Sequence, residues 1–233
     1  MPHPTLPGSH TGGVNDAPRA VIFDFGNTLF ANSDLSQTIA DAFRNLGADV
    51  DPDIVGPLGM RIYDAAHTPE EWALGRDLDA SVWAERWLVH YAIADEVIAG
   101  AGAEIYRLMH APERWIPFAT TADTLRRLHE AGVPVGVLSN TGWDIRTVFR
   151  HHELDQFIDA FALSYEIGCA KANPPAFWRA CDLLGVTPTQ ALMVGDDTTA
   201  DAGAANAGLR TLLLPLQEQG RDNGVGMVLR LFE

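Results

Sequence analysis

The feature that most constrains the fold of this chain is an apolar run that ends abruptly in a carboxylate. Residues 20–23 read Ala-Val-Ile-Phe, and Asp24, Gly26 and Asn27 follow directly. An unbroken apolar run of this kind is typical of a strand buried on both faces of a parallel sheet. A carboxylate at the end of such a strand lies where open α/β sheets bind ligands, although Asp24 on its own is equally compatible with a turn cap.

The second half of the chain alternates between short apolar runs and helical patterns. This alternation predicts an α/β fold with a doubly wound, Rossmann-like parallel sheet. Residues 225–232 are expected to pack as a last short element. We expect strands over 20–23, 133–138, 160–164, 191–194 and 211–214, and helices over 121–131, 144–150, 176–184 and 201–207.

Residues 32–116 show helical patterns and no buried-strand run, which predicts an all-α region inserted into the α/β core. Within it Trp83, Trp87 and Tyr91 recur every four residues, a stripe that we expect to form the core of that region. The less favoured alternative is that the stripe stacks on a substrate. The predicted organisation is a disordered tail over 1–18, an α/β core over 19–31 and 117–233, and the helical region between them.

Composition limits the possible partners. The 31 acidic and 16 basic residues give a net charge of −15, which argues against a nucleic-acid partner. No apolar run approaches the length of a membrane span, and the two cysteines, Cys169 and Cys181, lack disulfide or metal spacing. We therefore predict a cytoplasmic protein with reduced thiols, in which an anion site must be built locally. Nothing in the sequence indicates an oligomeric state.

Four polar residues follow or flank the predicted core strands. Asp24, Ser139 and Asp196 each end a strand, and Lys171, the only lysine, precedes a helix. Taken singly, Ser139 is compatible with a turn residue and Lys171 with a solvated charge. Asp196 together with Asp201 is compatible with a helix cap. Taken together they converge, because parallel strands place their carboxyl ends at one edge of the sheet.

The residue types at this edge favour phosphoryl chemistry. Two carboxylates with loop oxygens make a hard oxygen site suited to Mg²⁺, and a carboxylate beside the metal can attack phosphorus. Lys171 would neutralise the attacking carboxylate and the phosphoryl oxygens. The Ser139 hydroxyl and nearby backbone N–H groups would hold a phosphoryl oxygen.

Four motifs in order resemble those of the haloacid dehalogenase superfamily of phosphohydrolases, over about residues 19–215. The first is Phe23-Asp24-Phe25-Gly26-Asn27-Thr28-Leu29, and the second is Val137-Leu138-Ser139-Asn140. The third is Lys171-Ala172-Asn173-Pro174, with Ala172 where a proline is common, and the fourth is Val194-Gly195-Asp196 with Asp201 five residues on.

The resemblance implies a role for each motif residue. Asp24 would be the nucleophile and Lys171 its catalytic partner, while Ser139, Asn140 and Lys171 would bind phosphate. Mg²⁺ would be held by the carboxylates of Asp24 and Asp196 and the backbone carbonyl of Gly26, with Asp201 just behind. Residues 32–116 would be a cap that closes over the site and selects a small phosphorylated metabolite.

Gly26 departs from the pattern of the family's phosphatases. They usually carry a second Asp at this position, which protonates the leaving alcohol and then activates water. The favoured hypothesis is a phosphatase that uses a solvent proton, a good leaving group, or a substituted acid such as Asp34 or Asp144. The alternative is a non-catalytic member that binds a phosphorylated ligand or a protein partner. A dehalogenase-type hydrolase is less favoured, because the acidic fourth motif is kept.

Overall fold

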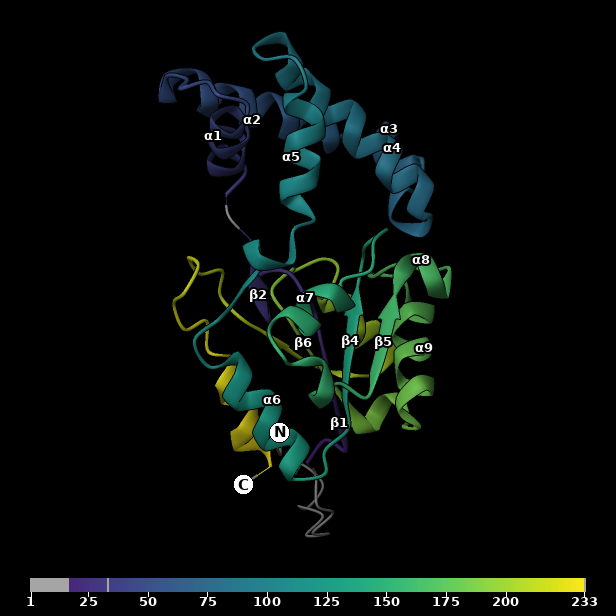
Figure 1. Cartoon of the computed structure of the whole chain (residues 1–233). Coiled ribbons are helices and arrows are strands. Elements are labelled where there is room, and N and C mark those ends of the chain that lie inside the picture. The colour runs from purple at the N-terminus through teal and green to yellow at the C-terminus, as the bar shows by residue number, and fades with distance from the viewer. Residues whose placement is uncertain (1–16, 33, 233) are drawn as a thin grey trace, which may run out of the picture.

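A five-stranded parallel sheet forms the centre of the molecule. The computed structural model describes residues 17–32 and 34–232, so most of the predicted tail lies outside the described residues. The strand order is β5-β4-β1-β6-β7, and every neighbouring pair is parallel (Figure 1). The strands are β1 (Ala20–Phe23), β4 (Val135–Ser139), β5 (Ala160–Leu163), β6 (Ala191–Gly195) and β7 (Arg210–Leu213).

Helices cover both faces of this sheet, as the unbroken apolar strands predict. In β1, Val21 and Phe23 pack into one apolar cluster and Ile22 packs into another on the opposite face. Figure 1 shows α6 on one side of the sheet and α9 on the other. The predicted doubly wound α/β fold is confirmed. One face of the sheet carries α6 (Thr121–Glu130), α7 (Arg146–His151), η4 (Asp155–Phe157) and η7 (Val225–Leu231). The other face is covered by α9 (Pro174–Leu184) and η6 (Ala202–Ala207). Two short helices lie in the connections, α8 (Ser164–Ile167) and η5 (Pro188–Gln190).

A layer of helices lies above the carboxyl ends of the strands (Figure 1). The chain enters it from β2 (Phe30–Ala31) and returns through β3 (Ile116–Pro117), which pair antiparallel. The layer has its own apolar cluster, which includes Ile39, Ile62 and Ile105. The boundaries of the predicted domains stay a prediction. The elements of this helical layer are α1 (Leu35–Asn45), α2 (Pro52–Ala66), α3 (Pro69–Ala73), η1 (Arg76–Leu78), α4 (Ala80–Tyr91), η2 (Ala92–Glu96), α5 (Ala101–Met109) and η3 (Pro112–Arg114).

The predicted elements are present, with small differences at their ends. The strand expected from residue 133 begins at Val135, because Pro134 has no N–H to donate and only its carbonyl takes part, accepting from Val21. The segment 202–207 is a 3₁₀ helix rather than an α-helix, and so is the last element. Cys169 and Cys181 are free thiols. Among the described residues, no helix combines the length and the apolar character needed to cross a bilayer.

The sequence predicted that the aromatic stripe of α4 forms the core of the helical layer, but only part of the stripe lies there. Tyr91 is 2 % exposed and belongs to that core, with Trp87 packed beside it. Trp83 instead turns to the sheet below, where it lies so close to Gly142 that a Cβ on that glycine would fall on the Trp83 side chain. The stripe therefore runs from the core of the layer into the junction with the sheet.

Candidate active site

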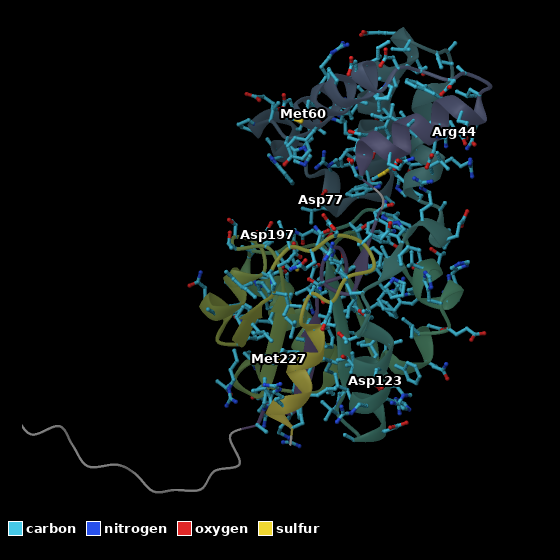
Figure 2. The ribbon with its side chains drawn as sticks, turned by 90° about the vertical axis from the view of Figure 1, so that its left-hand side faces the viewer. Arg44, Met60, Asp77, Asp123, Asp197 and Met227 are labelled. Carbon is cyan, nitrogen blue, oxygen red and sulfur yellow. The ribbon has the colours of Figure 1, made fainter. Side chains whose placement is uncertain are left out.

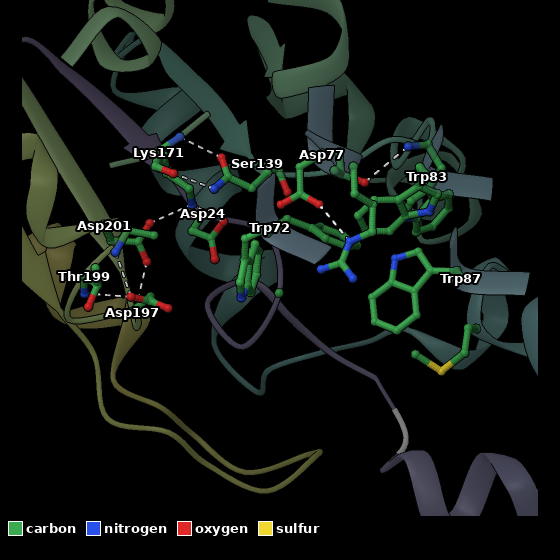
Figure 3. A pocket seen from close by; sticks show the side chains of 18 of the residues that line it. Asp24, Trp72, Asp77, Trp83, Trp87, Ser139, Lys171, Asp197, Thr199 and Asp201 are labelled. Carbon is green, nitrogen blue, oxygen red and sulfur yellow. Dashed lines mark hydrogen bonds and ion pairs between the residues drawn. The ribbon is translucent and has the colours of Figure 1, made fainter. Parts of the chain in front are cut away.

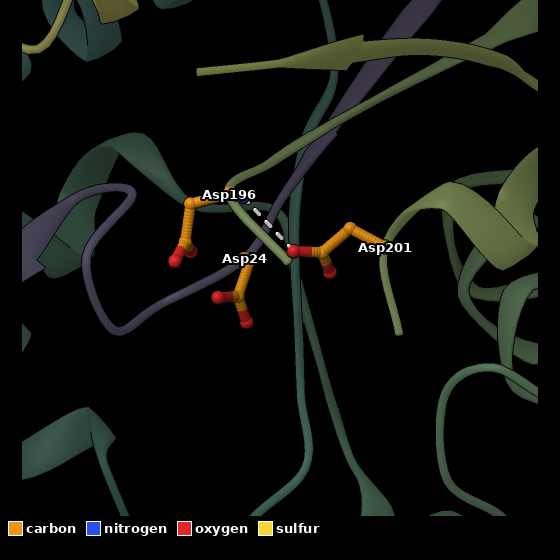
Figure 4. Close-up of side chains that lie close together, drawn as sticks. All are labelled: Asp24, Asp196 and Asp201. Carbon is orange, nitrogen blue, oxygen red and sulfur yellow. Dashed lines mark hydrogen bonds between the residues drawn. The ribbon is translucent and has the colours of Figure 1, made fainter. Parts of the chain in front are cut away.

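Three carboxylates and one lysine meet at the carboxyl ends of the strands. Asp24 follows β1 and Asp196 follows β6, while Asp201 precedes η6. Their carboxylate oxygens lie within 4.8 Å of one another. Figure 4 shows Asp24 and Asp196 directed to the same side, with the Asp201 carboxylate turned toward the backbone of Asp196. The convergence that the sequence predicted for these residues is thus present in the fold.

Lys171 lies between two of these carboxylates. Its Nζ is 2.5 Å from Asp24 Oδ1 and 2.6 Å from Asp201 Oδ1, and only 3 % of its side chain is exposed. Burial alone would lower the pKa of this ammonium, but the two carboxylates raise the pKa above its usual value. Lys171 therefore stays charged and fixes one oxygen of Asp24.

Asp201 is fully buried, and both of its oxygens are engaged. Oδ1 accepts from Lys171, and Oδ2 accepts from the backbone N–H groups of Asp196 and Asp197 at 3.0 and 2.9 Å. The close approach of the Asp201 carboxylate to the backbone requires a glycine at position 195, because a Cβ there would overlap the carboxylate. Asp201 is thus placed to orient Lys171 and the loop after β6 rather than to face a ligand.

The donor set of the cluster fits a divalent cation. Burial raises the pKa of the Asp24 carboxyl to about 7, opposed by Lys171 and reinforced by Asp201. Burial also raises the pKa of Asp196. Carboxylates crowded in this way repel one another, and a hard cation held by oxygen ligands relieves the repulsion. Asp24, Asp196 and the carbonyl of Gly26 are the oxygen donors at this edge that could hold Mg²⁺.

The loop after β1 is held from two directions. The Thr28 hydroxyl donates to Asp196 Oδ1 at 3.1 Å, which ties the loop to the fourth motif. Asn223, 1 % exposed and far away in sequence, donates its amide to the carbonyls of Asn27 and Thr28 at 3.2 and 2.9 Å. No motif marked Asn223, because its contact depends on how the C-terminal segment folds back.

Asn140 and Ser139 are placed differently from one another. The Asn140 side chain accepts from the Lys171 N–H and donates to the Lys171 carbonyl, both at 2.8 Å, so it holds the Lys171 loop. Ser139 is 5 % exposed and lines the cavity described next. Among the described residues no hydrogen bond occupies its hydroxyl. The Ser139 hydroxyl is therefore available to a ligand, whereas the Asn140 amide is engaged.

A cavity of about 590 Å³ lies between the helical layer and the sheet. In Figure 3 the charged residues Asp24, Lys171 and Asp201 lie toward one end, and Trp83 and Trp87 lie toward the other. Eight of its 22 lining residues carry aromatic side chains, and half of these eight belonged to no pattern in the sequence. The aromatic lining residues are Phe25, Trp72, Trp83, Trp87, Tyr91, His110, Trp115 and Trp143.

The two carboxylates that the sequence offered as possible substitutes for the missing acid lie outside the cavity. Asp34 caps α1 by accepting from the Ser36 N–H, and Asp144 is paired with Arg146; neither lines the cavity. The carboxylate that the helical layer does contribute is Asp77, which Figure 2 shows at the junction above Asp197. Burial raises the pKa of Asp77 above its usual value, against the opposing effect of Arg76.

Curated relatives match over part of the chain. Pyrophosphatase PpaX of Bacillus cereus (strain AH820) is 28 % identical over 113 residues, which are 48 % of this chain and 52 % of that protein. (S)-2-haloacid dehalogenase 4A of Burkholderia cepacia is 29 % identical over 112 residues, 48 % of each chain. The chain therefore spans about half the length of the curated relatives that it matches.

A solved structure shares the fold over most of the chain. The putative HAD-hydrolase YfnB of Bacillus subtilis, determined bound to magnesium, superposes with a TM-score of 0.67 at 17 % identity, covering 85 % of this chain and 87 % of that chain. At this identity the likeness concerns the fold alone. The model of the haloacid dehalogenase-like hydrolase family matches residues 18–208, which include all four motifs. By fold and motifs, the chain belongs to the haloacid dehalogenase-like hydrolases.

Proposed function

We propose that this protein is a Mg²⁺-dependent phosphomonoester hydrolase that acts through an aspartyl-phosphate on Asp24. The observation that carries the proposal is the position of Asp24. Its carboxylate lies at the floor of the cavity, is fixed by Lys171, and is next to the carboxylate of Asp196. Keeping an acidic residue at 196 favours phosphoryl transfer over halide displacement, because a metal-free reaction on a haloacid has no use for that charge.

Each residue of the site then has a defined role in the reaction. Asp24 forms a bond to phosphorus while the bond from phosphorus to the ester oxygen breaks, and water later releases phosphate from Asp24. Lys171 neutralises the attacking carboxylate and a phosphoryl oxygen, and the Ser139 hydroxyl donates to another. Asp24, Asp196 and the Gly26 carbonyl would hold Mg²⁺, which supplies charge stabilisation at the phosphoryl group. Asp201 and Asn140 position Lys171.

Metal removal tests this function directly. With Mg²⁺ present we expect release of inorganic phosphate from phenyl phosphate and acetyl phosphate, and with EDTA a loss of about 100-fold or more. Mg²⁺ should also raise the melting temperature, because it binds the folded protein and relieves the repulsion among the carboxylates. Asp196→Asn should weaken both effects. Release that continues unchanged in EDTA, or release of chloride from 2-chloropropionate in its place, would contradict the proposal.

Restoring the missing acid is a second test. A Cβ on Gly26 would have its nearest contact at 3.8 Å, with Cζ3 of Trp115, so the backbone there accepts a β-carbon without a clash. General acid–base help is worth about 10²–10⁴-fold. We therefore expect Gly26→Asp to raise kcat on benzyl phosphate, an alkyl ester, by about 100-fold, and to change kcat on phenyl phosphate far less.

Gly26→Asn is the matched control for this test, because the amide has the same shape and cannot act as the acid. It should raise neither rate. If Gly26→Asp leaves turnover of the alkyl ester unchanged or lowers it, another group of the wild-type protein already supplies the proton.

A further inference from the structure

The cavity above Asp24 is lined by tryptophan to an unusual degree. The chain contains six tryptophans, and five of them line this one cavity: Trp72, Trp83, Trp87, Trp115 and Trp143. We propose that the cavity binds a flat aromatic ring and that the substrate is an aryl phosphate, in which the ring is bonded directly to the ester oxygen. The inference rests on the proposed phosphatase function and names its substrate class.

The aromatic walls are fixed in advance. The Trp83 Nε1–H donates to His110 Nε2 at 3.1 Å, and His110 Nδ1 contacts the Tyr106 carbonyl at 2.7 Å, so the imidazole is the neutral tautomer with its proton on Nδ1. Burial lowers the pKa of His110, in agreement with that state. Trp115 donates to the Met109 carbonyl at 3.1 Å. Rings held in this way lose little freedom when a ligand stacks on them.

One donor in the wall has no acceptor. The Trp87 Nε1–H is buried, and within the described residues no group accepts its hydrogen bond. Trp87 lines the cavity, and its ring stacks on the ring of Tyr91 with 5.2 Å between the ring centroids. An unpaired buried donor is costly, so an acceptor brought within its reach would relieve the cost.

Arg76 excludes a cationic ligand such as a quaternary ammonium. Its guanidinium lies 4.5 Å from the centroid of the Trp87 ring, 5.1 Å from that of Trp72 and 5.9 Å from that of Trp83. A cationic headgroup on these rings would lie beside the guanidinium, and the two like charges would repel each other. The guanidinium is also held in place, because it donates to the Ala66 carbonyl at 3.0 Å. The part of the ligand that lies against these rings is therefore uncharged.

The missing acid points to the same substrate class independently. With Gly26 in place of an aspartate, the ester oxygen must leave without a proton from that position. A phenol has a pKa of about 10, whereas that of an alkyl alcohol is near that of water, about 16. When Asp24 bonds to phosphorus, an aryl oxide departs with the electron pair of the broken P–O bond and takes its proton from water. An alkoxide would need the acid that is missing.

The first experiment compares kcat/KM in Mg²⁺ for two phosphate esters and one acyl phosphate that vary the ring and the leaving group separately. Phenyl phosphate has both a ring and a good leaving group, benzyl phosphate has only the ring, and acetyl phosphate has only the leaving group. We expect phenyl phosphate to exceed benzyl phosphate by about 100-fold. In adenosine 5′-monophosphate the ribose separates the aromatic base from the phosphate, so the leaving group is an alkyl alcohol. We expect kcat/KM for this nucleotide to be no higher than for benzyl phosphate. Equal rates for the phenyl and benzyl esters, or a faster nucleotide, would overturn the inference.

Variants then test the cavity itself. Trp87→Leu should lower the ratio of kcat/KM on phenyl phosphate to that on acetyl phosphate by about tenfold, chiefly through KM. The control is Trp178→Leu, since this tryptophan lies outside the cavity, is 46 % exposed and donates to the Ala207 carbonyl. It should leave the ratio unchanged. A ratio that falls equally in both variants would overturn the inference.

Binding provides a readout that does not depend on turnover. Phenylphosphonate should quench the tryptophan fluorescence of the wild-type protein and bind about tenfold more tightly than propylphosphonate. Equal affinities would overturn the aromatic subsite. If the phenyl and benzyl esters are hydrolysed without any preference for the phenyl ester, the inference fails and the phosphatase function stands. If neither ester is hydrolysed, the proposed function itself fails.

Discussion

Asp24→Asn is expected to abolish turnover, with kcat lower by about 10⁴-fold or more, which corresponds to about 5.5 kcal/mol of transition-state stabilisation. The amide is a poor nucleophile, and no other carboxylate takes its place. Asp196 lies to one side with a hydrogen bond from Thr28, and Asp201 is engaged on both oxygens. The measurement is phosphate release from the best ester, wild type against variant, with Mg²⁺ in excess.

The Asp24→Asn protein should remain folded. The substitution is nearly isosteric and removes one of three crowded carboxylates, so the melting temperature of the variant should not fall below that of the wild type. Asp24→Ala guards against slow deamidation of the asparagine and should be equally inactive. Asp144→Asn is the matched control, because this carboxylate pairs with Arg146 outside the cavity, and its turnover should stay within about threefold of wild type. Substantial turnover in Asp24→Ala would disprove the aspartyl-phosphate mechanism.

Lys171→Met carries the second largest expected effect, a loss of about 10³-fold in kcat. The only lysine of the chain is 3 % exposed between Asp24 and Asp201. Removing it leaves two buried carboxylates without their cation, a kind of change that costs about 3–5 kcal/mol of folding stability. Both losses share one cause, because the same ammonium fixes Asp24 and balances its charge.

In Lys171→Met the loss of folding stability and the loss of kcat can be measured separately. Mg²⁺ should recover part of the lost melting temperature of Lys171→Met, since a cation near Asp24 replaces part of the missing charge, but it should not recover kcat. Arg146→Met is the control, because it removes a cation paired with Asp144 and Glu166 outside the cavity and should leave kcat within about threefold. A folded Lys171→Met protein with wild-type kcat would remove Lys171 from the mechanism.

Local sequence predicted the sheet edge and its contents well. Each core strand is a short apolar run, and a polar residue placed directly after it must lie at the carboxyl edge of a parallel sheet. Asp24 and Asp196 are in that position, and the side chain of Lys171 reaches both Asp24 and Asp201. The glycine at 195 belongs to the same pattern, because it leaves room for the Asp201 carboxylate.

The sequence predicted the packing of the helical layer less well than that of the sheet. Its helical patterns predicted an all-α region, and Thr68 and Asp79 accept from backbone N–H groups at the starts of α3 and α4. The periodicity of Trp83 and Trp87 predicted one apolar face, but both the core of a helical layer and the wall of a cavity require such a face. The periodicity therefore could not decide between them. Asp77 carried no pattern, and Asp34 and Asp144, which the sequence offered as possible substitutes for the missing acid, do not line the cavity.

The sequence by itself determined the parallel α/β core, the order of its motifs and the absence of an acid at Gly26, because these depend on neighbours along the chain. Only the tertiary structure decided that five tryptophans from separate segments surround one cavity, that Asn223 holds the loop after β1, and that Asp201 is engaged behind Lys171. Such contacts join residues tens to hundreds of positions apart. They depend on how the helical layer and the C-terminal segment pack against the sheet, which local patterns do not encode.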